Sequence, residues 1–134
     1  MTLANSVLDA LIAGNTRFRE GLSSPKPWQS ANAYTDQNPI AIILGCSDSR
    51  VPIEIIFDQG PGDLFVIRVA GNIVAPSPIR SAEFAALQLQ VPLVVVTAHT
   101  RCGAIDAPLH HMQHPGDHAT DTLKSIVYRI SPTL

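Results

Sequence analysis

Short apolar runs alternate with segments of helical spacing along this chain. The run at residues 39–45 is continuous enough for a strand buried on both faces, and residues 64–69 and 93–97 predict two further strands. The segments around these strands are predicted to be helical, from the spacing of their apolar residues or from a proline that can open a helix. They are residues 3–21, 52–58, 79–90, 104–112 and the stretch from Asp121. Strands that alternate with helices predict an α/β fold with three layers, a mainly parallel central sheet flanked by helices.

The length of the chain predicts one domain. A chain of 134 residues can bury a substantial core but is short for two domains. Residues 1–38 are expected to form an N-terminal helix and an extended arm, because prolines and polar residues follow the first helical segment. Residues 39–134 then form the α/β core.

Composition excludes several classes of function. Apolar residues make up 46% of the chain and charged residues 15%, which is typical of a folded globular protein and not of a disordered one. A net charge of −2 gives no basic surface for nucleic acid, and no apolar run approaches the ~20 residues of a membrane span. The N-terminal sequence lacks the features of a secretory signal, so a cytoplasmic location is expected. The two cysteines are then expected to be reduced and free to bind metal.

Residues with metal-binding chemistry follow two of the predicted strands. Cys46, Asp48 and Arg50 come directly after the first strand, and His99 and Cys102 come after the third. If these strands are adjacent, the crevice at the carboxyl edge of the sheet receives all of them. Two thiolates and one imidazole suit zinc and leave a fourth position open, as in catalytic zinc sites.

Each of these signals is weak when it is taken alone. A His-x-x-Cys pair is more often a buried histidine beside a core cysteine, and a lone Cys46 has the same explanation. Asp48 and Arg50 alone could form a structural or surface ion pair. Their joint placement at strand ends favours a metal site.

The two motifs together resemble those of the β-class carbonic anhydrases. The similarity also covers residues 11–18, 58–65 and 68–72 and continues to about Arg129. The resemblance implies reversible hydration of carbon dioxide to bicarbonate and a proton, with one Zn²⁺ per chain. It matches the zinc ligands to Cys46, His99 and Cys102. Asp48 matches an aspartate that ligates zinc in closed forms of the family and otherwise hydrogen-bonds the reacting water, and Arg50 matches the arginine that holds this aspartate off the metal.

The resemblance also implies a substrate pocket and an assembly. The matching pocket residues are Gln37, Phe65, Ala70, Phe84 and Gly103, although Gln37 could be a plain loop amide and the aromatic residues could be core. Gln37, together with Ile43 in place of a tryptophan, favours the open, plant-like subgroup. In the family the residue matching Phe84 reaches the site from a second subunit. A homodimer or larger homo-oligomer is therefore expected, with residues 79–89 at the shared surface.

Three alternatives remain open at this point. The same ligands would serve a hydrolase of carbon disulfide or carbonyl sulfide. The chain also stops at Leu134, before the C-terminal segment usual in the family, so it could be a truncated, non-catalytic zinc-binding or assembly subunit. His110, His111, His114 and His118 form a separate cluster, a candidate second metal site or proton shuttle. A solvated helix end and loop is the favoured interpretation of that cluster.

Overall fold

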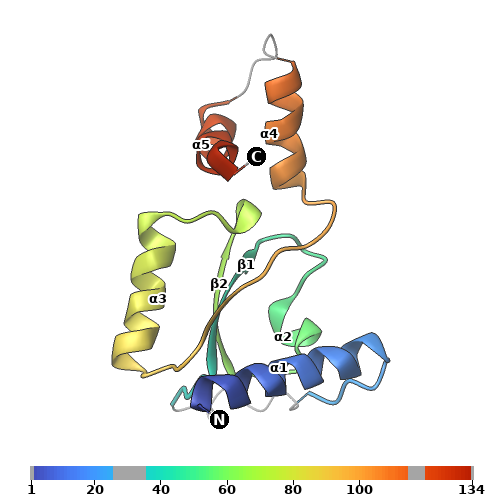
Figure 1. The fold of residues 1–134 in the computed structure, drawn as a ribbon, viewed down its shortest axis with the longest axis vertical. Coiled ribbons are helices and arrows are strands. Elements are labelled where there is room, and N and C mark those ends of the chain that lie inside the picture. Colours follow the sequence, from blue (N-terminus) through green and yellow to red (C-terminus); the bar gives the residue numbers. More distant parts are fainter. Residues whose placement is uncertain (1, 26–35, 115–119, 134) are drawn as a thin grey trace.

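The computed structural model describes residues 2–25, 36–114 and 120–133 (Figure 1). Helices alternate with strands along most of the chain, as the apolar pattern predicts. The elements are α1 (Leu3–Arg19), β1 (Ala41–Cys46), α2 (Ile53–Ile56), β2 (Leu64–Val69), η2 (Ala70–Asn72), α3 (Pro76–Gln88), β3 (Val94–Val96), α4 (Gly103–Gln113), α5 (Asp121–Ile130) and η3 (Ser131–Thr133).

The sheet is parallel and places β1 in its centre. The strand order is β2-β1-β3, so the first and third strands are neighbours. Cys46 at the end of β1 pairs with Val69 at the end of β2, and Leu44 pairs with Val96 at the end of β3. All three strands therefore end at the same edge of the sheet, and the segments that follow β1 and β3 leave from that edge.

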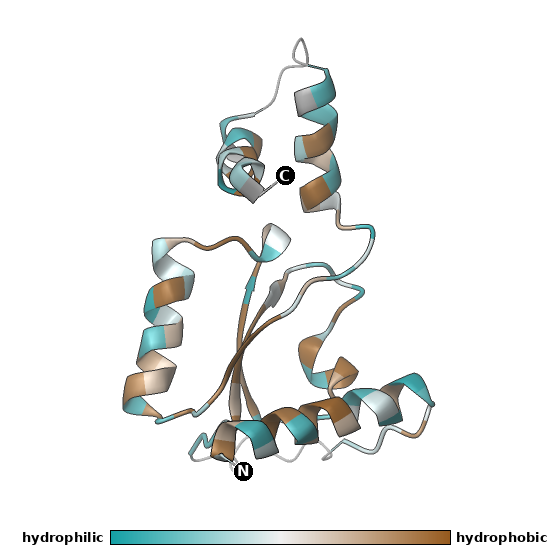
Figure 2. Ribbon diagram, viewed as in Figure 1, coloured by the Kyte–Doolittle hydropathy of each residue, from teal (hydrophilic) through white to brown (hydrophobic). Residues whose placement is uncertain are grey.

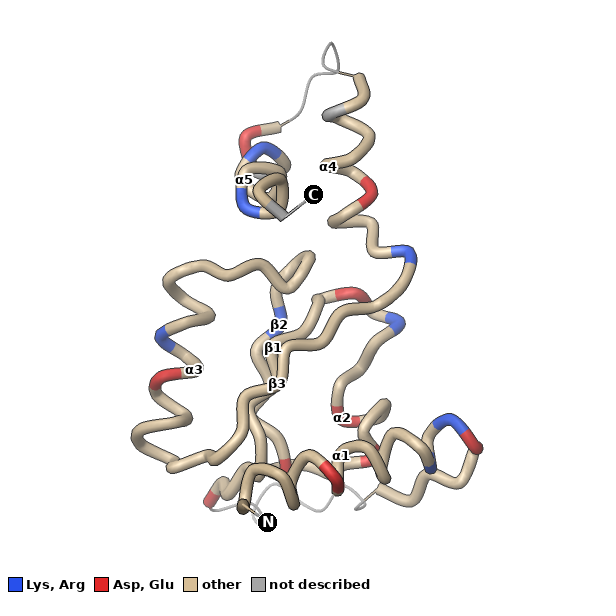
Figure 3. Tube along the Cα trace, viewed as in Figure 1, with Lys and Arg blue, Asp and Glu red and all other residues tan. Residues whose placement is uncertain are grey.

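Helices cover both faces of the sheet, which confirms the predicted three-layer α/β fold (Figures 1 and 2). Alternate residues of β1 point to opposite faces. Ile43 packs with α1 and α2, in a cluster that includes Leu11 and Ile53. Ile42 packs with α3 on the other face, in a cluster that includes Ala85. Burial on both faces explains why β1 has no charged side chain. The lysine, arginine, aspartate and glutamate residues lie on other parts of the trace (Figure 3).

The last two helices, α4 and α5, pack against each other beyond the carboxyl edge of the sheet (Figure 1). They are connected to the rest of the chain mainly through contacts of α4 with η2 and through the loop that follows β3. No helix within the described ranges is both long and apolar enough to cross a membrane.

One helix boundary differs from the sequence prediction. α3 begins at Pro76 rather than at residue 79. The first turn of a helix has N–H groups without helical partners, so Pro76 and Pro78 lose nothing by lacking one there. The prolines therefore lie inside the helix that they were expected to precede.

The N-terminal helix packs closely on the segment that follows β1. Gly14 is buried, and a Cβ atom at this position would overlap the backbone carbonyl of Phe57. The side chain of Asn15 donates a hydrogen bond of 2.8 Å to the carbonyl oxygen of Ile56. Arg17 forms an ion pair with the buried carboxylate of Asp58. These contacts hold α1 against α2.

Gly14→Ala should therefore destabilise the fold. The added methyl group meets a backbone atom that cannot rotate away, so α1 has to shift and lose part of its contact with α2. We expect a loss of about 1–3 kcal/mol in the free energy of unfolding, the usual range for overpacking. Urea denaturation measures it, with Ala13→Leu on the exposed side of the same helix as the control. An unchanged free energy in Gly14→Ala would contradict the close packing.

Candidate metal centre

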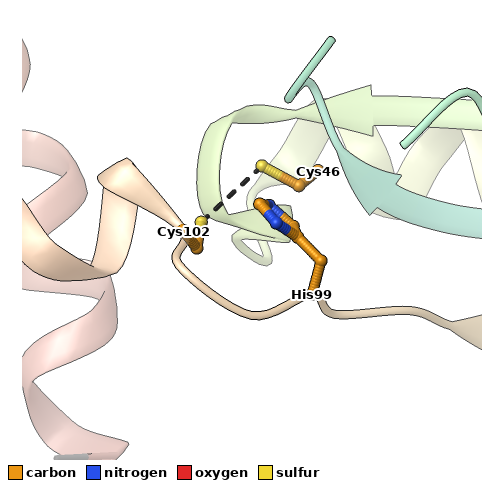
Figure 4. A group of neighbouring side chains, drawn as sticks. All are labelled: Cys46, His99 and Cys102. Carbon is orange, nitrogen blue, oxygen red and sulfur yellow. Dashed lines mark hydrogen bonds between the residues drawn. The ribbon is translucent and has the colours of Figure 1, made fainter. Parts of the chain in front are cut away.

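Cys46, His99 and Cys102 meet at the carboxyl edge of the sheet (Figure 4). Cys46 ends β1, His99 lies in the loop after β3, and Cys102 is the residue directly before α4. Their ligand atoms all lie within 4.8 Å of one another, and the two Sγ atoms are 3.8 Å apart. Both cysteines are free and buried. The adjacency of β1 and β3 thus brings together residues that are more than fifty positions apart in sequence.

The imidazole of His99 presents one nitrogen to this cluster. Nδ1 lies 3.0 Å from the carbonyl oxygen of Thr100. A carbonyl only accepts hydrogen bonds, so in the neutral ring Nδ1 carries the proton and Nε2 has a free lone pair. Nε2 is buried, and it has no hydrogen-bond partner among the described residues. A buried nitrogen of this kind calls for an explanation, and a metal ion bound beside the two thiols would supply one.

The two thiols have different environments. Burial would raise the pKa of Cys46, but its interactions with His99 and with the N–H groups of Asp48 and Gly71 outweigh burial and lower the pKa to about 7. The N–H of Gly71 donates to Cys46 Sγ over 3.3 Å. Burial raises the pKa of Cys102, although the N–H groups at the start of α4 act in the opposite direction. The pKa of His99 is raised, chiefly by its interaction with Cys46.

Asp48 is held by Arg50 in a two-pronged ion pair beside the cluster. Arg50 Nε donates to Oδ1 over 2.9 Å, and Nη2 donates to Oδ2 over 2.8 Å. These hydrogen bonds keep the pKa of Asp48 well below its usual range. Asp48 Oδ2 lies 3.8 Å from His99 Nε2, but Asp48 does not belong to the group of three mutually close ligands. Arg50 also donates to the carbonyl oxygen of Arg101 over 2.8 Å, which ties the two ligand loops together.

Arg68 is a residue of this site that the sequence analysis did not identify. Its Nε donates to the carbonyl oxygen of Cys46 over 3.1 Å, and its Nη2 donates to that of Asp48 over 2.6 Å. Arg68 therefore fixes the backbone from which both side chains project. The available signal was a single cation within the otherwise apolar strand β2, at the position that pairs with Gly45.

The predicted substrate residues lie at several places around the sheet. Phe65 and Phe84 contact each other on the α3 face, with ring centroids 6.3 Å apart. Ala70 is exposed in η2, Gly103 is exposed at the start of α4, and Gln37 is exposed before β1. Their roles in substrate binding stay predictions.

A cavity of about 440 Å³ lies beside His99 and Cys102, and its other lining residues were not expected from the sequence. They come from η2, from the segment after it, from the loop after β3 and from α4 and α5: Gly71, Asn72, Ile73, Val74, Ala98, Ile105, Arg129 and Ile130.

The histidines of α4 do not build a second three-ligand group within the described residues. The rings of His110 and His114 are stacked, with centroids 4.4 Å apart, and both residues are exposed. His111 is partly buried, and His118 lies outside the described residues.

Zinc affinity should fall as the pH is lowered, most steeply below about pH 7. Thiols must lose their protons to bind metal. Because the pKa of Cys46 is lowered to about 7, only Cys102 has to release a thiol proton above that pH, whereas both cysteines must do so below it. The logarithm of the apparent affinity should change by about one per pH unit above pH 7 and by about two or more below it. Chelator competition titrations measure this, and a constant slope across pH 7 would contradict it.

Comparisons with known proteins give one consistent relationship. A family profile described as carbonic anhydrase matches residues 41–134. Carbonic anhydrase 2 of Mycobacterium tuberculosis is 42% identical over 132 residues, which cover 93% of this chain and 61% of that protein. A carbonic anhydrase of Pseudomonas aeruginosa is 40% identical over 103 residues, covering 72% of this chain and 47% of the relative. The chain thus spans less than two thirds of these relatives.

Solved structures agree with the sequence relatives. A β-carbonic anhydrase of Aspergillus fumigatus superimposes with a TM-score of 0.65 at 28% identity, over 93% of this chain and 59% of that one. One of two tetrameric β-carbonic anhydrases of Sordaria macrospora gives a TM-score of 0.66 at 27% identity, over 96% and 64% of the two chains. The apo form of a carbon disulfide hydrolase has a TM-score of 0.51 at 20% identity, over 96% and 67% of the two chains, a likeness of fold alone.

Proposed function

The chain belongs to the β-carbonic anhydrase family, and we propose that it is a zinc enzyme that catalyses the reversible hydration of carbon dioxide to bicarbonate and a proton. The observation that carries the proposal is the convergence of Cys46, His99 and Cys102 beside a carboxylate that Arg50 restrains. In this proposal the zinc ligands are the three clustered residues.

The donor set fits zinc. Sulfur and imidazole nitrogen are the ligands that zinc prefers, and three protein ligands leave one coordination position for water or substrate. The unpartnered Nε2 of His99 and the lowered pKa of Cys46 both favour metal binding. A zinc ion bound there would supply a Lewis acid and lower the pKa of coordinated water.

Asp48 and Arg50 have complementary roles in this proposal. The carboxylate of Asp48 stays ionised and accepts a hydrogen bond from the reacting water, which orients the water toward carbon dioxide. Arg50 occupies both carboxylate oxygens and so keeps Asp48 from acting as a fourth metal ligand. This pairing supports the open, plant-like subgroup. Gln37, Phe65, Ala70, Phe84 and Gly103 are the proposed substrate-binding residues.

Stopped-flow measurement of carbon dioxide hydration, with metal analysis of the same sample, tests the proposal. We expect about one zinc ion per chain and a rate far above that of buffer. Carbon disulfide and carbonyl sulfide are assayed in parallel. A protein that binds zinc but turns over none of the three substrates would be the non-catalytic alternative. Faster turnover of carbon disulfide or carbonyl sulfide than of carbon dioxide would indicate the hydrolase.

We further propose that the protein acts as a homodimer or larger homo-oligomer. α3 carries exposed apolar side chains, among them Ile79, Phe84 and Leu87, with exposed fractions of 46%, 50% and 73%. Exposed apolar residues gathered on one helix favour a protein interface. Sedimentation equilibrium at micromolar concentration tests this, and a fully active monomer would overturn it.

A further inference from the structure

The cavity beside His99 and Cys102 has mostly apolar walls and one permanently charged residue. Ile73, Val74 and Ile105 are among its apolar residues. Arg129, from α5, is the one Lys, Arg, Asp or Glu among the described residues that line it. Arg129 is exposed, so its guanidinium is in contact with solvent as well as with the mostly apolar cavity.

Arg129 is anchored, yet most of its hydrogen-bonding capacity is unused. Its Nη1 donates to the carbonyl oxygen of Val74 over 3.1 Å. A guanidinium has five N–H donors. Among the described residues, no carboxylate lies within ion-pair distance of Arg129. The remaining donors and the positive charge are therefore open to solvent or to a ligand.

Arg129 is also held in place by the packing of its helix. The next residue, Ile130, is buried, with an exposed fraction of 6%. Ile130 lies against Gly71, because a Cβ atom added to this glycine would come within 3.1 Å of Ile130 Cδ1. Gly71 is also the residue whose N–H donates to Cys46 Sγ. The packing of Ile130 on Gly71 thus holds α5, which carries Arg129, beside the cluster.

Among the described residues, no other lysine, arginine, aspartate or glutamate lines the cavity. Two cysteine thiolates would balance the charge of a divalent metal, so the metal group would have no net charge to attract an anion. Asp48 and Arg50 neutralise each other. Arg68 donates to the carbonyl oxygens of Cys46 and Asp48. Arg129 is the uncompensated cation on the cavity wall.

We propose that this cavity binds a small monovalent oxyanion, such as bicarbonate, and that Arg129 recognises its charge. The inference rests on the proposed function for the identity of the natural anion, since bicarbonate is the product of that reaction. The guanidinium donates to the oxyanion through the N–H groups that Val74 leaves free. Arg129 is in this view a binding residue for the product and for inhibitory anions.

Anion binding by three variants tests the inference. The probes are bicarbonate and nitrate, and the readouts are calorimetry and the rise in melting temperature with anion concentration, on zinc-loaded protein. Arg129→Gln should weaken binding of both anions about tenfold, the order expected for loss of a charge-assisted hydrogen bond. Arg129→Lys keeps the charge and should stay within about threefold of the parent. Lys124→Gln removes the other basic residue of α5, which does not line the cavity, and should leave binding unchanged (Figure 3).

The outcomes separate this inference from the proposed function. If carbon dioxide is hydrated but Arg129→Gln binds both anions like the parent, the anion site is overturned and the function stands. If carbon dioxide is not hydrated but the loss of anion binding in Arg129→Gln is restored in Arg129→Lys, the anion site stands and the function falls. Equal losses in Arg129→Gln and Lys124→Gln would indicate a general charge effect and would overturn the recognition by Arg129.

Discussion

Replacing Cys46 or Cys102 by serine should remove most of the bound zinc and, with it, the hydration activity. A hydroxyl is a far poorer zinc ligand than a thiolate, and a serine oxygen keeps its proton at neutral pH. Changes to residues that merely orient zinc ligands weaken metal affinity by about 10–100-fold, so loss of a ligand should exceed about 100-fold. Equilibrium dialysis followed by metal analysis measures the zinc content of each variant.

Ser49→Ala is the matched control for these variants. It lies in the same loop as Cys46 and is exposed, so it should keep its zinc. Circular dichroism of the metal-free proteins shows whether the cysteine variants remain folded. Full zinc occupancy in both cysteine variants would refute the ligand assignment, whatever their activity.

Asp48→Asn should lower the turnover number by about 100-fold while zinc is retained. In the proposed function the charge of Asp48 orients the reacting water. The amide lacks this charge and breaks the two-pronged pair with Arg50. Because Arg50 keeps the pKa of Asp48 well below its usual range, the carboxylate is ionised throughout the neutral and alkaline range. As the reacting water ionises, the activity should rise toward alkaline pH in both proteins, but to a lower plateau in the variant.

Stopped-flow pH profiles of the two proteins, with zinc analysis, measure this effect. Asp106→Asn removes a carboxylate from the exposed first turn of α4 and should leave the profile unchanged. An Asp48→Asn protein of parental activity would exclude the orienting role. A flat profile between neutral and alkaline pH in the parent protein would contradict the expected alkaline rise.

The sequence predicted those parts of the fold that depend on local pattern and simple topology. The continuous apolar run of β1 predicted a strand buried on both faces, and its side chains pack on both faces of the sheet. Parallel strands end at one edge, so the positions of Cys46, His99 and Cys102 at two strand ends predicted their convergence on the condition that these strands are neighbours. The order β2-β1-β3 meets that condition. The start of α3 was missed because prolines were taken as a boundary and not as its first turn.

The remaining site residues depend on contacts that no local pattern contains. Arg129 and Val74 are 55 positions apart, and their hydrogen bond exists only because α5 packs beside η2. The amphipathic pattern of α5 indicates that one face is covered, but not by which element. Gly71 has a φ of 65°, and its close approach to Ile130 depends on the same packing. The lining of the cavity therefore became visible only in the folded chain.

The link between Arg50 and the carbonyl oxygen of Arg101 has a consequence for redesign. Because the acceptor is a backbone oxygen, this hydrogen bond does not use the side chain at position 101. Arg101 has a φ of 56°, so glycine and asparagine suit this backbone at least as well as arginine does. Position 101 is therefore an adjustable point on the rim of the site, where an engineer can remove or retain a positive charge while the loop that presents His99 and Cys102 keeps its course.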